Sequence, residues 1–316
     1  MAKATSSRRS SSSGPAARSV ARVVQRDIDS WPDFIGLMSG WNGFRNWCFR
    51  GQADARWPLH CSLSRHVVVS KVCKDAWALQ ESRIRRIFER KSHLFLGSPP
   101  SGDELEWLAL MQHHGAPTRL LDFTWSPYVA AFFALERATG DAAVWALNLP
   151  LLWHLHDRHR CGGVRVGDAD PRDPQAFEKF YLSNEHRFVW QGDPFRMPQR
   201  VVAQSGTFVV TSDLGTTVDQ IVAAYPGTGE LLVKFVLKTE QLRAQAMASL
   251  YSMNITNASL FPGLDGLARS MAYEFEYSWQ VDVTTNAVLP SLADPRLPDG
   301  VLGCRARPDS VAIRDA

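Results

Sequence analysis

Polar residues that could do chemistry gather in one otherwise apolar stretch of the chain. Thr118, Arg119, Asp122, Thr124 and Ser126 are the densest polar set in the predicted strand and turn over residues 119–126. Burying such groups without partners costs about 1–3 kcal/mol each, so we expect each of them to meet a protein partner or a ligand. An internal ion pair between Arg119 and Asp122 is one alternative, and capping of the next helix is the expected role of Ser126.

Gln112, His113 and His114 precede Gly115 at the predicted end of a helix over residues 103–114. Imidazoles at this place suit a phosphate, a base edge or nicotinamide, and a helix C-terminus favours their protonated form. Adjacent histidines point in different directions, so we expect at most one to face a cleft. The alternative is that one caps the helix and the other packs. No carboxylate or third histidine stands at ligand spacing, so no metal site is predicted.

Arg50 stands at the predicted end of a strand, directly before Gly51. A guanidinium can hold a pyrophosphate or a ribose through two parallel hydrogen bonds, which a lysine does less well. The alternative is an arginine that ties down the following loop.

Four segments occur here in an order that resembles a known family. They are Phe-Arg-Gly at 49–51, QHHGAPTRLLDFTWSP at 112–127, QSGTF at 204–208 and LFPGLDGL at 260–267. Together they resemble the FRG domain, which takes its name from the first of them. The resemblance spans about residues 28–276, and the second segment is the most specific.

The resemblance implies an α+β fold similar to ADP-ribosyltransferases, with a small split β-sheet that holds NAD in a cleft. NAD is then the substrate, and some members of the family resemble transferases that place ADP-ribose on nucleic-acid bases. The implied NAD-binding residues are Arg50, Gln112, His113, Arg119, Thr124 and Ser126. The implied catalytic residues are Asp122, Gln204 and His114.

Gln204 departs from the transferase pattern, in which a glutamate usually occupies the corresponding strand. That glutamate holds the ribose 2′-hydroxyl and stabilises positive charge at the anomeric carbon. A glutamine can hold the hydroxyl but supplies no charge. Asp122 is the first choice for the missing carboxylate and Glu230 the second.

Three functions are compatible with these residues. The first is an NAD-dependent mono-ADP-ribosyltransferase whose acceptor is a nucleic-acid base, single-stranded or flipped out of a duplex. The second is a module that binds NAD, ADP-ribose or a nucleotide without chemistry, which Gln204 favours. The third is a hydrolase of NAD, or of a phosphodiester with His113 or His114 as general base. The sequence identifies no regulatory protein partner.

The remaining chain predicts the elements that must position these residues. Strands are expected at 44–50, 119–124, 142–149, 200–211 and 231–238, and helices at 75–96, 103–114, 127–137, 240–253 and 265–275, with another starting after Ser30. Residues 150–197 have no clear pattern. The expected organisation is a tail at 1–26, one FRG domain at 27–280 and a loop-rich extension at 281–316.

Composition limits the class of protein. No apolar run approaches the roughly 18–20 residues of a membrane span, so no membrane partner is expected. Five cysteines at irregular spacings argue against a disulfide scaffold and favour a cytoplasmic protein. Residues 1–26 carry six basic and no acidic residues, and are expected to be disordered. They suit a solvated tail, an electrostatic contact with nucleic acid or an organellar transit peptide.

Overall fold

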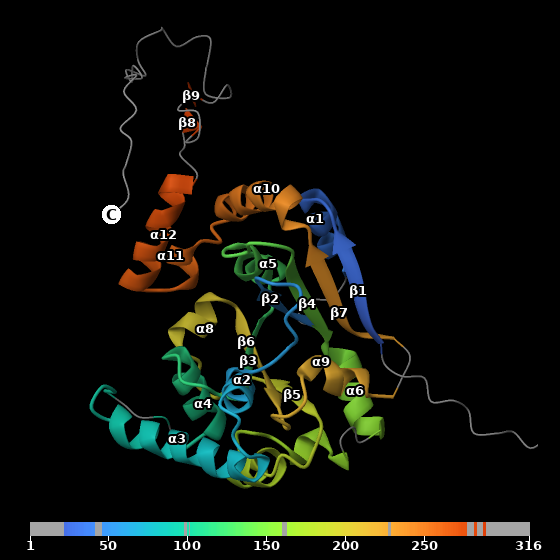
Figure 1. Ribbon diagram of the computed structural model, residues 1–316, viewed down its shortest axis with the longest axis vertical. Coiled ribbons are helices and arrows are strands. Elements are labelled where there is room, and N and C mark those ends of the chain that lie inside the picture. The colour runs from blue at the N-terminus through green and yellow to red at the C-terminus, as the bar shows by residue number, and fades with distance from the viewer. Residues whose placement is uncertain are drawn as a thin grey trace, which may run out of the picture.

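The structure is a computed structural model that describes residues 22–41, 46–97, 100, 102–159, 163–226, 229–276, 281–282 and 287–288. A seven-stranded mixed sheet lies at its centre, in the order β1-β7-β4-β2-β3-β6-β5 (Figure 1). β1 runs parallel to β7, and every other neighbouring pair is antiparallel. The strands are β1 Arg22–Ile28, β2 Trp47–Gln52, β3 Leu120–Thr124, β4 Ala142–Asn148, β5 Val189–Gly192, β6 Gly206–Thr211 and β7 Glu230–Leu237.

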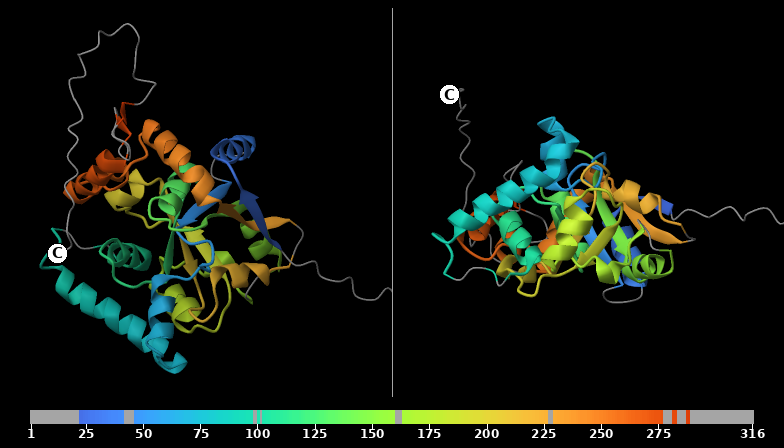
Figure 2. Two further views of the ribbon diagram at one scale, coloured as in Figure 1. Left: turned by 45° about the horizontal axis from the view of Figure 1, so that its top comes forward. Right: turned by 90° about the horizontal axis from the view of Figure 1, so that it is seen from below.

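Helices cover both faces of this sheet (Figures 1 and 2). One face packs against α1 Trp31–Gly40, α5 Pro127–Leu135 and α10 Thr239–Ser252. The other packs against α2 Ser62–Val69, α4 Glu104–His113, α6 Leu149–His159 and α9 Val218–Ala223. Further elements are η1 Lys74–Ala76, α3 Trp77–Ser92, η3 Val166–Asp168, α7 Pro174–Phe177, the π-helix η4 Glu178–Leu182, α8 Gln199–Ala203, α11 Asn257–Leu260, α12 Leu264–Glu276 and the pair β8 Val281–Asp282 and β9 Ala287–Val288.

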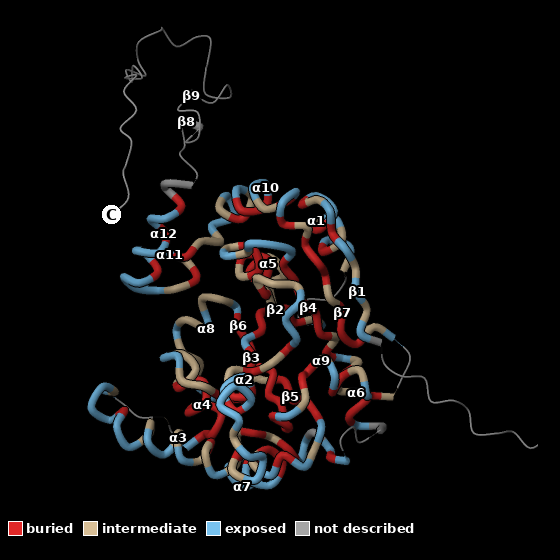
Figure 3. Tube along the Cα trace, viewed as in Figure 1, coloured by how far each residue is buried: buried red, intermediate tan, exposed pale blue. Residues whose placement is uncertain are grey.

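Buried residues follow the strands of the sheet (Figure 3) and form two clusters. The two clusters lie on opposite faces of β4, whose residues from Ala142 to Leu147 are all buried and point alternately into one cluster and the other. Burial on both faces gives a strand a continuous apolar sequence instead of an alternating one. The apolar pattern that predicted this strand is therefore confirmed.

The sheet opens between β2 and β3. These strands share a single paired position, Phe49 with Thr124, whereas β2 and β4 pair along six residues. Gly51 allows α5 to approach β2 here, since a Cβ at Gly51 would lie 2.0 Å from the carbonyl oxygen of Ala130. The divergence leaves room between two strands that both carry predicted site residues.

Several local predictions are confirmed. Ser30 and Ser126 cap α1 and α5, and each helix has a proline in its first turn. Gly115 follows α4 with φ +80°, and Ala116 N–H donates to the carbonyl of Met111, as in a Schellman cap.

The boundaries differ in three places. β1 begins at Arg22, so regular structure starts before the predicted boundary at residue 27. The region expected to be a strand at 200–211 holds α8 and then β6. The region 150–197, which had no clear pattern, contains most of α6 and all of η3, α7, η4 and β5. Residues 1–21 and most of 281–316 lie outside the described residues.

The fold class is α+β, with a mixed sheet and flanking helices. Among the described helices, none has both the length and the apolar character that crossing a bilayer requires.

Candidate functional site

A cleft of about 830 Å³ lies where β2 and β3 diverge. Arg50 and Gly51 from β2 and Asp122 and Thr124 from β3 line it. Other lining residues come from the segment after β2, from α2, from the C-terminal end of α5 and from α8 with its cap. They include Trp57, His60, Arg65, Phe133, Glu136, Arg137, Arg200 and Gln204. Clefts of roughly 300–1,000 Å³ hold small molecules and cofactors.

Arg50 spans the divergence of the two strands. Its Nη1 donates to the backbone carbonyl of Asp122 at 2.7 Å. Asp122 is not paired with any residue of β2, since β2 and β3 pair only at Phe49 and Thr124. The Nε of Arg50 is buried without a hydrogen-bond partner in the described part of the chain. Burial lowers the pKa of Arg50, and the charge of Asp122 partly opposes this effect. The arginine has both a structural contact and donor capacity left for a ligand.

The carboxylate of Asp122 is held from one side. Gln112 Nε2 donates to Asp122 Oδ1 at 2.7 Å, and the hydroxyl of Thr118 donates to Gln112 Oε1. Asp122 Oδ2 has no hydrogen-bond partner among the described residues, and Asp122 is the one exposed residue of β3. Gln112 therefore acts on the site through Asp122, since Gln112 is not among the residues that line the cleft.

Thr124 and Gln204 both line the cleft, but their side chains already make hydrogen bonds within the protein. The hydroxyl of Thr124 donates to the carbonyl of Gln204 at 2.8 Å and accepts from Ser126 N–H at 3.1 Å. The side-chain amide of Gln204 donates to the carbonyl of Leu260 at 3.1 Å. Gln204 caps α8 and does not lie on a strand, so its expected place on the strand is corrected.

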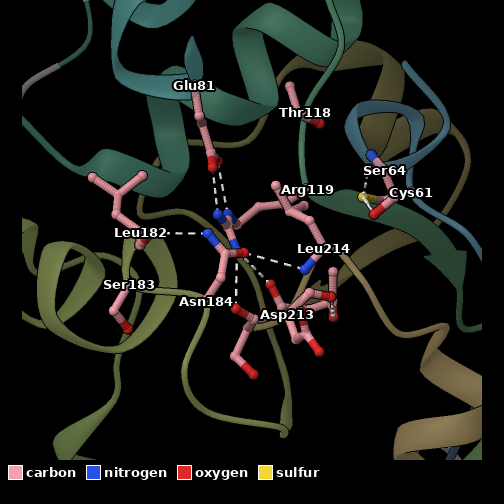
Figure 4. A network of polar contacts seen from close by, with 12 residues as sticks. Cys61, Ser64, Glu81, Thr118, Arg119, Leu182, Ser183, Asn184, Asp213 and Leu214 are labelled. Atoms are coloured by element: carbon pink, nitrogen blue, oxygen red, sulfur yellow. Dashed lines mark hydrogen bonds and ion pairs between the residues drawn. The ribbon is translucent and has the colours of Figure 1, made fainter. Parts of the chain in front are cut away.

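Arg119 is not among the residues that line the cleft. It is fully buried and forms a two-pronged ion pair with Glu81 of α3 (Figure 4), and its Nη1 donates to the carbonyl of Thr211 at 2.9 Å. The predicted ligand-binding role of Arg119 is therefore corrected to a structural one. The alternative ion pair with Asp122 is also absent, because the partner is Glu81.

Four other candidates lie away from the cleft. His113 and His114 are not among its lining residues, and their rings meet edge to face at 4.8 Å. Burial lowers the pKa of His113, helped by the charges of His114 and Arg200, which is opposite to the protonated form that was expected. Ser126 lines a smaller cavity of about 270 Å³, in addition to capping α5. Glu230, the second-choice carboxylate, pairs with Arg26 at 2.6 Å.

The structure adds residues that sequence patterns missed. Arg65, Arg137 and Arg200 bring three more guanidinium groups to the cleft, and Glu136 brings a second carboxylate beside Asp122. Glu136 is engaged, because its Oε1 accepts from Asn257 Nδ2 at 3.0 Å. Trp57 lies at the cleft with 55% of its surface exposed. None of these residues stands in a recognisable local motif, and only the fold collects them.

The cleft is cationic. Four arginines and two carboxylates line it, so the lining favours an anion. Guanidinium groups suit phosphate oxygens in particular. Within the described residues, no cluster of three or more His, Cys, Asp or Glu side chains could hold a metal ion.

Comparison with known proteins finds one family model that matches a part of the chain carrying several of the cleft residues. Residues 45–142 match the family model of the FRG domain. The matched FRG domain runs from β2 to the start of β4 and includes Arg50, Gln112, Asp122 and Thr124, but neither Arg200 nor Gln204. No curated protein and no solved structure matches the chain significantly.

Proposed function

We propose that this protein is an NAD-dependent mono-ADP-ribosyltransferase that uses the cleft at the β2–β3 divergence. The observation that carries the proposal is the convergence of Arg50 and Asp122, from separate strands of the matched FRG domain, on one cationic cleft. An arginine-rich cleft fits the pyrophosphate of NAD. Trp57 and Phe133 offer aromatic surface for its adenine and nicotinamide rings.

In the proposed reaction, the bond between the ribose C1′ and the nicotinamide nitrogen breaks, and its electron pair leaves with nicotinamide. Positive charge develops on C1′ and the ring oxygen. The carboxylate of Asp122, oriented by Gln112, stabilises that charge, with Oδ2 free to meet the sugar. A lone pair of the acceptor atom then forms the new bond to C1′, and the acceptor proton passes to solvent.

The acceptor in this proposal is an unpaired nucleic-acid base. A base must leave its stack to reach a cleft of this kind, so single strands and flipped nucleotides are the expected substrates. A cationic cleft favours an acceptor that carries phosphates.

The proposal predicts a specific effect of Asp122→Asn. Transfer from labelled NAD to single-stranded DNA or RNA should fall by roughly 10²-fold in kcat, since one well-placed electrostatic stabiliser contributes on the order of 3 kcal/mol at the transition state. KM for NAD should change far less, because the charge develops only as the bond breaks. Label transfer and nicotinamide release measure both effects.

Asp141→Asn is the matched control. It makes the same carboxylate-to-amide change at a residue that pairs with Lys238 outside the cleft, so transfer should persist. A thermal melt of each variant separates loss of folding from loss of chemistry. Full activity in a folded Asp122→Asn protein would remove Asp122 from the mechanism.

A second candidate function is binding of NAD or ADP-ribose without transfer. The hydrogen bond from the Gln204 amide to the carbonyl of Leu260 favours this candidate, because that donor is then not free to hold the ribose. Calorimetric binding of NAD by the wild-type protein, without release of nicotinamide or label on any acceptor, would establish this candidate in place of the transferase.

A further inference from the structure

The segment LFPGLDGL, at residues 260–267, packs against the cleft wall through Phe261. Phe261 meets Phe133 of the cleft edge to face at 5.9 Å, and the preceding residue, Leu260, is buried and accepts the hydrogen bond from Gln204. Gly266 permits the tight approach of α12, since a Cβ there would lie 1.9 Å from the carbonyl oxygen of Phe261. The segment therefore holds one aromatic ring at a fixed place beside the cleft.

Two arginines share that ring. The guanidinium carbon of Arg200 lies 4.5 Å from the ring centroid of Phe261, and that of Arg269 lies 5.1 Å from it. Arg200 comes from α8 and lines the cleft, whereas Arg269 comes from α12, is exposed and is not a lining residue. We call these two side chains the Phe261 arginine pair.

The Phe261 arginine pair lacks a counter-charge of its own. In the described part of the chain, neither guanidinium has a carboxylate within ion-pair distance. Each stacks on the ring by a cation–π contact, but the two positive charges repel each other. Burial lowers the pKa of Arg200, the charge of Asp122 opposes this effect, and the positive charge of Arg269 adds to the lowering. An anion that touches both guanidinium groups would relieve this repulsion.

We propose that the Phe261 arginine pair binds a phosphodiester group of a single-stranded nucleic acid at the edge of the cleft. The assignment of this strand as the acceptor rests on the proposed transferase function. Because Arg200 lines the cleft and Arg269 does not, the bound phosphate lies between the cleft and the exposed surface of α12. A strand anchored there can place a neighbouring base in the cleft.

Phosphate is favoured by the geometry of the two groups. A guanidinium presents parallel N–H donors that match two oxygens of a phosphate, and stacking on Phe261 holds each fork in place. The alternative anionic partner is an acidic protein segment, in which two carboxylates would be needed to contact both arginines.

The test compares Arg269→Ala with Arg83→Ala. Both variants remove one exposed arginine, but Arg83 lies on α3, away from α12 (Figure 1). Fluorescence anisotropy with a labelled mixed-sequence single-stranded oligonucleotide gives the affinity at several salt concentrations. Arg269→Ala should weaken binding about 10-fold and reduce the slope of log K against log salt by about 0.7, the value for one lost phosphate contact on a single strand. Arg83→Ala should leave both quantities close to wild type.

A second variant tests the role of the ring. Phe261→Leu keeps an apolar side chain but removes the surface that holds the guanidinium groups. It should weaken oligonucleotide binding while both arginines remain, and a thermal melt checks that α11 and α12 are still docked.

Nicotinamide release without any acceptor separates this inference from the proposed function. Arg269→Ala should leave that release unchanged, because Arg269 is outside the cleft. If no nicotinamide is released even by wild type but Arg269→Ala still weakens oligonucleotide binding, the transferase proposal fails and the phosphate site stands. Equal losses in Arg269→Ala and Arg83→Ala, an unchanged affinity in Arg269→Ala, or binding of polyglutamate in place of the oligonucleotide would each overturn the inference.

Discussion

Asp122 departs from the burial pattern of its strand because its side chain faces the cleft. The other four residues of β3 are buried, and a carboxylate at the centre of such a strand is unfavourable unless it meets water, a donor or a ligand. Here it faces a cleft and takes one hydrogen bond, from Gln112. The polar residue in an apolar run was therefore the correct signal for a residue that lines the cleft.

Gly51 is the residue on which the architecture of the cleft depends most directly. Substitution to alanine would place the new Cβ 2.0 Å from Ala130 O and 2.6 Å from Ala134 N, both backbone atoms of α5. Backbone cannot rotate away as a side chain can, so either α5 or β2 must shift. We expect Gly51→Ala to destabilise the protein by about 3 kcal/mol or more, judging from the cost of overpacking, as measured by urea unfolding.

Gly36→Ala is the matched control for this prediction. Gly36 lies within α1, and a Cβ there would meet no atom within 4 Å. Alanine is favoured over glycine inside a helix by roughly 0.5–1 kcal/mol, so this variant should be as stable as wild type or slightly more stable. A Gly51→Ala protein with wild-type stability would show that α5 does not pack against β2 as described.

At the scale of elements, helix-capping residues and continuous apolar runs were the sequence features that predicted helices and strands most reliably. Ser126 with Pro127 marked the start of α5, and the apolar residues of β4 marked a strand buried on both faces. Both signals depend on residues that are close together in the chain. That is why α4, α5, β4 and β7 were predicted to within a few residues, and the start of α1 was predicted as well.

Contacts between distant segments could not be predicted in the same way. Arg119 and Glu81 are 38 residues apart, and nothing local distinguishes their buried ion pair from a ligand-binding arginine. Arg200 joins the cleft only because α8 ends beside β3, and a short helix directly before a strand was interpreted as part of that strand. The residue types were informative, but their partners depended on the fold.

β1 is the element whose interpretation changes most, since residues 22–26 were assigned to the tail. It forms the edge of the sheet and pairs with β7 along its whole length, and Arg26 binds Glu230 through both carboxylate oxygens. Deleting residues 1–28 removes this strand and exposes the edge of β7, whereas deleting residues 1–21 spares it. We expect a melting temperature several degrees lower for the longer deletion than for the shorter one.

The comparison between the two truncated proteins isolates the contribution of β1, because both lack residues 1–21. Differential scanning fluorimetry at equal protein concentration is sufficient. Identical melting temperatures would mean that the parallel pairing of β1 with β7 adds nothing to stability.

At the scale of the whole molecule, the site follows from a sheet that has a packed core on each face but opens between β2 and β3. The two core clusters hold β4 and β7 on one side of the opening and β6 and β5 on the other. Arg50 bridges the opening, and Arg200 and Gln204 from the region of α8 line the cleft, with the Gln204 amide bonded to the carbonyl of Leu260. Rigid halves around an opening position ligand-binding groups better than loops alone.

The same packing predicts how the stability of the whole protein depends on pH. His156 of α6 is fully buried between Phe188 and Tyr225, and its Nε2 lies 3.4 Å from the Tyr225 hydroxyl. Burial lowers the pKa of His156 from 6.5 to about 4, opposed by hydrogen bonding with Val189 and by the charge of Asp157. The folded protein therefore holds this imidazole neutral at pH values where the unfolded chain protonates it. The contribution to stability is complete above about pH 6.5 and is lost as the pH falls toward 4. Over that interval it amounts to about 3 kcal/mol, since one unit of pKa corresponds to about 1.4 kcal/mol.

Urea unfolding at pH 7 and pH 4.5 measures how the free energy of unfolding changes with pH. Wild type and His114→Gln, which alters an exposed histidine, should show the same dependence on pH, and His156→Phe should show a shallower one. A proton NMR titration gives an independent check, because His156 in the folded protein should not titrate above pH 5. An unchanged slope in His156→Phe, or a titration of His156 near pH 6.5, would show that this histidine is not held neutral by burial.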